Sequence, residues 1–355
     1  MNTLDRYLYR TVIGYALMAM AVLLTLGGLF LFITEQGDIG TGNYTAFEAF
    51  LYALLNLPQQ AFELLPIGAM IGALMGLGNL AAGSELIVTR ASGVSIWRVA
   101  WPVGLAGATL SIAMYGIGEF AAAPLAQFAK RDKTVHEMAD VSFAGKSSAW
   151  IKDGNRIMRV QTGEVDQKFG GVTLFELDGV AALSSIQRAE RISVAQPGQW
   201  RLQNLSSSRF ENGHVQAGFR AQDIIGSTVN ADFLGLAAND PDLLTLRGLA
   251  SYIDHLRRNN LETASYEIGF WSRIARIFAV VIVTLLSLPF VFGPLRTTGA
   301  GARTVVGILL GVVFFLITRT IENGGQLFGM NPALVGWLPT AVIGVCTVAA
   351  IARTR

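Results

Sequence analysis

The chain has 355 residues, of which 52% are hydrophobic and only 15% charged, and its mean hydropathy is +0.46. Because an average soluble domain carries about 25% charged residues, this composition excludes a disordered chain and a coiled coil and indicates a membrane protein. The net charge of +2 excludes nucleic-acid binding through a basic surface, and the single cysteine excludes a disulfide scaffold and a thiolate zinc site.

Six stretches without a charged residue predict membrane-spanning helices. A helix crosses the ~30 Å hydrocarbon layer with about 20 apolar residues. Three stretches precede a long polar segment and three follow it, namely 11–34, 64–83, 99–118, 277–295, 304–318 and 333–352. We therefore expect an α-helical membrane protein with six transmembrane helices in two sets of three, and an inserted polar domain between the sets.

The ends of these stretches predict how the chain is oriented. The first stretch is expected to be an uncleaved anchor, since it is longer than the apolar core of about 7–15 residues in a signal peptide. The loops 35–63 and 323–332 contain no lysine or arginine, whereas eight arginines flank the opposite ends: Arg6, Arg10, Arg90, Arg98, Arg296, Arg303, Arg353 and Arg355. The positive-inside rule then places both termini in the cytoplasm and the polar domain outside.

The polar domain reads as β structure. Short β-branched runs alternate with turn pairs such as Asp153-Gly154, Asp178-Gly179 and Asn212-Gly213. We expect an extracytoplasmic antiparallel β-jelly-roll domain, followed by a helix capped near Thr245. The expected divisions are 1–123 for the first three helices, 124–262 for the β domain with its C-terminal helix, and 263–355 for the last three helices.

No pattern in the sequence indicates catalysis. There is no G-x-S-x-G turn, no H-E-x-x-H helix and no histidine–cysteine pairing. His136 and His214 lie about 80 residues apart without metal-ligand spacing, so we interpret both as structural. We expect no active site, no metal site and no cofactor in this chain.

Residues 83–93 form the most distinctive short segment. Ser84 is suited to cap a helix, Glu85 to lie in its first turn, and Gly93 to end it in a left-handed conformation. The segment predicts a helix of two turns over about 84–93, between the second and third spans. Two interpretations stay open: a helix that receives force from a cytosolic motor, or a lipid-facing loop helix.

The second span contains glycines at four-residue intervals, Gly68, Gly72 and Gly76. This spacing aligns three positions without side chains on one stripe, which lets another helix approach closely. The stripe serves either a sliding contact or plain packing within the chain. Pro66, Pro102 and Pro289 mark possible kinks or helix starts.

Charges near the outer ends of the spans are candidates for substrate contacts. Arg319 and Glu322 lie three residues apart on the fifth span, where a charge needs a partner or a cavity. They form either an internal ion pair or, through Arg319, a contact with an anionic headgroup. Glu119, near the outer end of the third span, is a further candidate for an ion pair here. Three basic residues after the third span are solvated linker charges or headgroup ligands: Lys130, Arg131 and Lys133.

Several motifs together resemble the LptF/LptG permeases of the lipopolysaccharide exporter. The resemblance covers the whole chain, and 3 + 3 helices around an outer β domain is the plan of that family. The motifs that carry it are Leu4-Asp5-Arg6-Tyr7, Gly83-Ser84-Glu85-Leu86, Ala91-Ser92-Gly93, Trp150-Ile151-Lys152-Asp153-Gly154 and Phe292-Gly293-Pro294-Leu295-Arg296.

The resemblance implies a function and a set of partners. The chain would pair with the paralogue LptF on a dimer of the ATPase LptB, which binds the ATP and Mg²⁺, and would extract lipopolysaccharide from the outer leaflet of the bacterial inner membrane. It would pass the lipid to LptC and a periplasmic bridge. Glu85, with Arg90 and Gly93 as neighbours, would face the ATPase in the coupling helix, and Lys130, Arg131 and Lys133 match the family's basic segment.

One departure from the family concerns the end of the first span. Some relatives carry a lysine there, whereas residues 30–38 contain no basic residue. We hypothesise that Arg319 supplies this charge from the fifth span. Two other functions remain as alternatives, a secondary transporter of an amphipathic substrate and a non-transporting assembly factor or anchor. Charge-free spans disfavour the first of these, because such transporters use broken helices with charges at mid-membrane.

Overall fold

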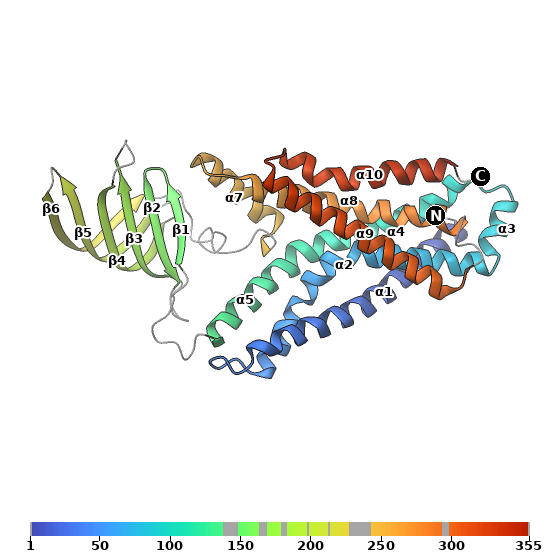
Figure 1. Cartoon of the computed structure of the whole chain (residues 1–355), viewed down its shortest axis with the longest axis horizontal. Helices are drawn as coiled ribbons and strands as arrows, with labels where there is room; N and C mark the ends of the chain where they lie inside the picture. The colour runs from blue at the N-terminus through green and yellow to red at the C-terminus, as the bar shows by residue number, and fades with distance from the viewer. Residues whose placement is uncertain are drawn as a thin grey trace. The chain divides into compact units, whose positions relative to one another are not determined.

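The structure is a computed structural model that describes residues 2–137, 148–162, 169–178, 183–196, 199–211, 214–226, 243–292 and 298–353. The chain forms two compact units, a helical unit of residues 1–140 and 264–355 and a β unit of residues 141–263. Figure 1 shows both, with the β unit inserted in the chain between α5 and α8. The helical unit extends past the expected boundary at residue 124, because α5 continues the third span.

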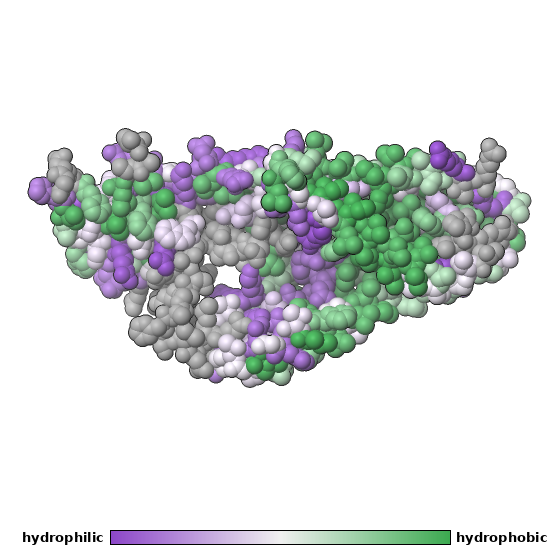
Figure 2. All heavy atoms as spheres, in the orientation of Figure 1, coloured by the Kyte–Doolittle hydropathy of each residue, from purple (hydrophilic) through white to green (hydrophobic). Residues whose placement is uncertain are grey.

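Six helices in the described part of the chain are long and apolar enough to cross a membrane. Apolar residues gather over this bundle in the space-filling view (Figure 2). The helices confirm the two expected sets of three: α1 (Thr3–Glu35), α2 (Ala46–Ala82), α4 (Ile96–Ile117), α8 (Ala264–Phe292), α9 (Ala300–Leu327) and α10 (Pro332–Arg353).

Most of these helices extend beyond the charge-free runs that predicted them. The first begins at Thr3 because the carboxylate of Asp5 accepts a hydrogen bond from the amide of Asn2, at 3.0 Å. The second begins at Ala46, where Thr45 accepts from the amide of Phe47 and Glu48 accepts from the amide of Thr45. These reciprocal bonds satisfy amides that have no partner within a helix. Much of the expected outer loop 35–63 is therefore helix.

The third span does not end where its apolar run ends. After α4 the chain makes a π-helical turn, η2 (Gly118–Ala122), and continues as α5 (Ala123–Glu137). The expected linker charges after residue 124 thus lie on a helix of the helical unit. Pro66, Pro102 and Pro289 all lie inside helices rather than at their starts. Neighbouring helices in a bundle can accommodate the backbone groups that proline frees.

Glycines bring two helices close to α2, which is the most buried of the six. A Cβ atom on Gly72 would overlap the backbone of Ala16 on α1, and one on Gly68 would overlap Met20. On another side of α2, Gly307 and Gly311 of α9 pack against Ile71 and Ile67. The expected close packing of the glycine stripe is confirmed for Gly68, Gly72 and Gly76, all of which face α1.

The β unit contains one antiparallel sheet of six described strands, which pair in the order of the sequence. This confirms an inserted antiparallel β domain; the Greek-key connections of a jelly roll are not among the described strands. The strands are β1 (Ser148–Asp153), β2 (Arg156–Thr162), β3 (Phe169–Leu177), β4 (Leu183–Gln196), β5 (Gln199–Glu211) and β6 (His214–Gly226).

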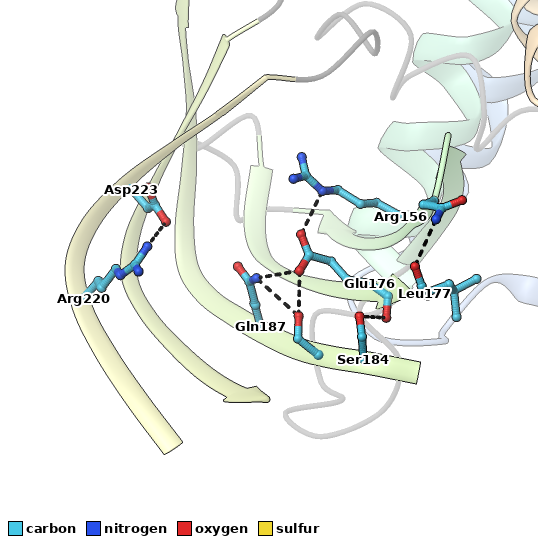
Figure 3. A network of polar contacts seen from close by, with 9 residues as sticks. Arg156, Glu176, Leu177, Ser184, Gln187, Arg220 and Asp223 are labelled. Atoms are coloured by element: carbon cyan, nitrogen blue, oxygen red, sulfur yellow. Dashed lines mark hydrogen bonds and ion pairs between the residues drawn. The ribbon is translucent and has the colours of Figure 1, made fainter. Parts of the chain in front are cut away.

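A carboxylate joins three of these strands (Figure 3). Glu176 on β3 accepts from Nε of Arg156 on β2 at 2.9 Å, and from Ser185 and Gln187 on β4 at 2.8 and 3.3 Å. The Glu176 carboxylate is partly buried, and a buried charge without hydrogen-bond donors is costly. Because its donors come from β2 and β4, the network stabilises the pairing of β2, β3 and β4.

The helix expected near Thr245 is α7 (Leu246–Arg258). It begins because the Thr245 hydroxyl accepts from the amide of Gly248 at 3.0 Å. It ends in a Schellman motif, in which Asn260 adopts a left-handed conformation and the amide of Leu261 donates to the carbonyl of Leu256. One apolar face of the helix is buried, formed by Leu249, Tyr252, Ile253 and Leu256.

Candidate functional site

The segment 84–93 folds as the expected two-turn helix, α3 (Glu85–Ala91). Gly93 follows it with φ +91°, which confirms the predicted left-handed end. Ser84 differs from the prediction, since it adopts φ +64° and its side chain makes no capping hydrogen bond. A capping residue ordinarily has an extended backbone, and the left-handed conformation of Ser84 accounts for the missing bond.

Three side chains fix α3 to the helical unit. Leu86 is buried in the hydrophobic core together with residues of α1, α2, α4 and α8. The Arg90 guanidinium lies 5.3 Å from the ring centroid of Phe292, the last residue of α8. Glu85 interacts with the phenol of Tyr7 on α1. The helix is therefore connected to α1 and α8, while Val88 on its outer face is exposed.

A second polar contact lies at the starts of α1 and α4. Asp5 is buried, and its carboxylate lies 3.0 Å from the guanidinium of Arg98. Both chain termini and α3 lie at this end of the helical unit (Figure 1).

Toward the opposite end, a cluster of four charged residues joins α2, α8 and α9. Glu322 is 5% exposed, and both of its oxygens accept from the Arg276 guanidinium, at 2.8 and 2.9 Å. Arg319 lies farther away, 3.7 Å from Glu322 and 3.9 Å from Glu63. The expected Arg319–Glu322 pair is present, but the principal partner of Glu322 is Arg276.

Three members of this charge cluster, Glu63, Arg276 and Arg319, line a shallow pocket between α2, α8 and α9. Its apolar wall is formed by Pro66, Ile67, Phe314 and Phe315, and its polar wall by Glu63, Arg276, Thr318 and Arg319. Because Arg276 is engaged by Glu322, Arg319 is the cation best able to meet an anionic group. The pocket thus combines an apolar wall with one partly exposed guanidinium.

The basic residues of α5 are not equivalent. Nζ of Lys133 lies 2.7 Å from Glu35 and 2.7 Å from Asp38, and near the rings of Tyr44 and Tyr52. Lys130 and Arg131 are exposed. A basic group from α5 thus reaches the C-terminal end of α1, although two carboxylates already neutralise it.

The groups around Lys133 also order the loop between α1 and α2. The Tyr44 hydroxyl donates to Glu35 at 3.0 Å, and burial together with this bond raises the pKa of Tyr44 well above its usual value. Tyr44 therefore stays a donor at any physiological pH. Among the described residues, no three histidine, cysteine, aspartate or glutamate side chains converge as a metal site would require.

The fold and these sites define a multi-pass membrane protein that has a short helix between two spans, a charge-lined pocket between others, and an inserted β domain. Residues 6–353 match the family described as lipopolysaccharide export system permease LptF/LptG, and the chain belongs to this family. The resemblance drawn from the motifs is therefore confirmed.

Two relatives show how far the similarity extends. The lipopolysaccharide export system permease protein LptG of Escherichia coli strain K12 is 30% identical over 344 residues, which are 96% of this chain and 95% of that protein. The LptG protein of Haemophilus influenzae strain Rd is 28% identical over 339 residues, 95% and 94% of the two chains. The similarity thus includes the helices and the β unit together.

Arg276 was missed by the sequence reasoning. It stands one position before the charge-free run 277–295, where a flanking arginine is ordinary, and no local spacing connects it with Glu322 on another helix. The usable signal is indirect, because a carboxylate within a span needs a cation on a neighbouring helix. The Asp5–Arg98 pair was missed for the same reason. The Gly293–Arg296 part of the last family motif lies outside the described residues.

Proposed function

We propose that this chain is a permease subunit of an ATP-driven exporter, which extracts lipopolysaccharide from the outer leaflet of the bacterial inner membrane and passes it to a periplasmic bridge toward the outer membrane. The observation that carries this proposal is the match to lipopolysaccharide export permeases over residues 6–353. The six apolar helices and the inserted sheet support it, since the similarity covers both units.

The proposal includes a set of partners and an orientation. The chain pairs with an LptF paralogue on a separate LptB ATPase dimer, which binds ATP and Mg²⁺, while LptC and the bridge take the lipid. Both termini and α3 lie in the cytoplasm and the β unit lies in the periplasm. The arginines near the chain termini and α3 support this orientation through the positive-inside rule.

A purification from native membranes tests the proposal. The tagged full-length chain is extracted in a mild detergent, and the proteins and lipids that accompany it are identified by mass spectrometry. We expect a second permease, a nucleotide-binding subunit and lipopolysaccharide. Purified chain that hydrolyses ATP or releases lipopolysaccharide directionally without a second protein would contradict the proposal.

Within this function, α3 is assigned to contact with the ATPase. Glu85 is exposed at the start of α3, whereas Leu86 anchors the helix in the core. This arrangement presents a carboxylate on a rigidly held helix. Movement imposed on α3 reaches α1 through Tyr7 and α8 through the contact between Arg90 and Phe292.

Glu85→Ala is expected to weaken binding of the ATPase about tenfold, equivalent to roughly 1.4 kcal/mol for one well-placed polar contact at an interface. The measurement is titration of the ATPase onto the purified permease pair, with ATP turnover as the second readout. Glu85→Gln keeps the size and the polar contact with Tyr7, so it separates the charge from the shape. Normal assembly and turnover in Glu85→Ala would remove Glu85 from the interface.

Arg319→Ala is expected to lower the stimulation of ATP hydrolysis by lipopolysaccharide about tenfold, because a charge-assisted hydrogen bond contributes roughly 1.5–3 kcal/mol. Arg319→Lys keeps the positive charge and should retain part of the response. ATPase activity is measured in the reconstituted complex with and without lipopolysaccharide, and photo-crosslinking from the same pocket reports occupancy. Unchanged stimulation and crosslinking in Arg319→Ala would show that Arg319 serves only its pairs with Glu63 and Glu322.

A further inference from the structure

The chain contains three histidines, and one of them is buried between α7 and the β1–β2 hairpin. His255 lies on α7 and is 8% exposed, whereas His214 on β6 is exposed and His136 lies on α5 of the helical unit. Histidine is the side chain whose charge ordinarily changes between pH 5 and 8. A buried histidine at a contact between two elements therefore makes that contact a candidate for control by pH.

The histidine belongs to a chain of hydrogen bonds that joins the end of α7 to the β1–β2 hairpin. The backbone amide of Gly154, in the turn between β1 and β2, donates to Oδ1 of Asn259 at 2.8 Å. The amide group of Asn259 must then turn its Nδ2 toward His255, whose Nε2 lies 3.2 Å away. The ring makes a further hydrogen bond to the backbone of Lys152 on β1.

These roles require a neutral ring. Since Nδ2 of Asn259 is a donor, Nε2 of His255 accepts, and the ring proton lies on Nδ1. A second proton would place N–H groups of His255 and Asn259 face to face. Rotating the Asn259 amide would relieve that contact but would turn its NH₂ group toward the Gly154 amide, which is also a donor. No orientation of Asn259 satisfies both neighbours once the ring is charged.

We propose that His255 makes the attachment of α7 to the β1–β2 hairpin acid-sensitive, so that protonation of the ring releases the C-terminal end of α7 from the sheet. The attached and released states differ in the length of free chain between the sheet and α8. The sheet is joined to α8 through α7, and only five residues separate Arg258 at the end of α7 from Ala264 at the start of α8. Release lengthens the tether between the β unit and the first helix of the second set.

Some of the charged groups around the ring raise the pKa of His255 and others lower it. Burial is the largest influence and lowers the pKa of His255; Arg258 on α7 also lowers it, while Asp153 on β1 and Asp254 on α7 raise it. Asp254 is itself paired with Arg258, which limits its effect on the ring. The net direction is downward, so the attached state excludes the proton that the released state binds.

The direction of the pKa shift of His255 fixes the pH range over which the attachment of α7 weakens. The released ring titrates near its usual pKa of about 6.5, whereas the attached ring titrates below it. The released state therefore binds more protons below that pH, and attachment weakens as the pH falls. Between pH 7.5 and 5.5 the ratio of attached to released α7 falls by up to about tenfold, the limit reached when the attached ring stays neutral.

Hydrogen exchange of the full-length chain in detergent tests the proposal. The protection factors of α7 amides, corrected for the intrinsic effect of pH on exchange, are measured at pH 7.5 and 5.5 by mass spectrometry. We expect protection to fall by up to about tenfold in the wild type and to be unchanged in His255→Gln, which does not titrate. His214→Gln changes an exposed residue of β6 and should keep the wild-type response. Protection independent of pH in the wild type, or an equal fall in His255→Gln, would overturn the proposal.

A second variant keeps the proposal testable if His255→Gln does not fold. Asn259→Asp has nearly the same shape. It gives up the bond that Nδ2 of Asn259 donates to the His255 carbonyl at 3.0 Å at every pH, but its carboxylate can accept from the Gly154 amide and from a protonated ring at the same time. Its α7 should therefore keep or gain protection as the pH falls from 7.5 to 5.5, the reverse of the wild type. A wild-type response in Asn259→Asp would show that His255 and Asn259 do not control the attachment.

Discussion

Gly72→Leu is expected to displace α1 from α2 and to destabilise the helical unit by about 3 kcal/mol or more, the upper end of the range for overpacked cores. A Cβ atom at this position would overlap the backbone of Ala16, which cannot rotate away as a side chain can. Relief therefore requires that α1 move as a whole. The measurement is the unfolding midpoint of the purified chain in detergent, with its level in the membrane as a second readout.

Gly116→Leu is the matched control for Gly72→Leu. Gly116 lies inside α4, and a Cβ atom there would meet nothing within 4 Å. Both substitutions add the same apolar side chain and raise helix propensity by the same amount, about 1 kcal/mol. The two variants differ in whether the new side chain overlaps the backbone of a neighbouring helix. Equal midpoints for the two variants would show that close approach at Gly72 contributes nothing to stability.

The sequence predicted the helical framework because membrane insertion depends on a local property. A run of about 20 uncharged residues is visible in one window, and nearly all the described residues of each such run are helical in the structure. The glycine stripe was equally readable, since Gly68, Gly72 and Gly76 align by helical periodicity alone. Helix ends were less readable. The capping bonds at Asp5 and Glu48 extend helices into charged sequence, where hydropathy gives no signal.

The parts that escaped prediction depend on which helices become neighbours. Arg319 and Glu322 were paired from their spacing on one helix, but Arg276 comes closer to Glu322 from α8. Lys133 was read as a linker charge or a lipid ligand, yet the π-helical turn η2 and α5 carry it to Glu35 and Asp38. Tertiary packing decides such pairs, and a single sequence does not report it.

These neighbour-dependent contacts divide the helical unit into two ends with different chemistry. At the end that holds the termini, Leu86 and the Asp5–Arg98 pair fix α3 and the starts of α1 and α4. Toward the other end, carboxylates hold Arg276 and Lys133, and Arg319 remains partly exposed in the pocket. α1 spans both ends and packs on α2 through backbone contact at Gly72. α1 thus joins the two ends through its packing on α2.

Arg276→Met is expected to destabilise the helical unit by about 3–5 kcal/mol, because it leaves the buried carboxylate of Glu322 without its principal partner. Arg319 is the remaining cation, at 3.7 Å, and it would be drawn from Glu63 toward Glu322. The variant should therefore lose part of its response to lipopolysaccharide as well as stability. The measurements are the unfolding midpoint in detergent and the stimulated ATPase activity of the reconstituted complex.

Two controls separate the buried charge from the loss of a side chain. In the double variant Arg276→Met with Glu322→Met, stability should return toward that of the wild type, since two apolar residues can replace a buried ion pair at little cost. Arg220→Met removes an ion pair on β6 whose arginine side chain is 68% exposed, and it should cost less than about 1 kcal/mol. If Arg276→Met is no less stable than Arg220→Met, then Glu322 does not depend on Arg276, and the pocket holds Arg319 by another means.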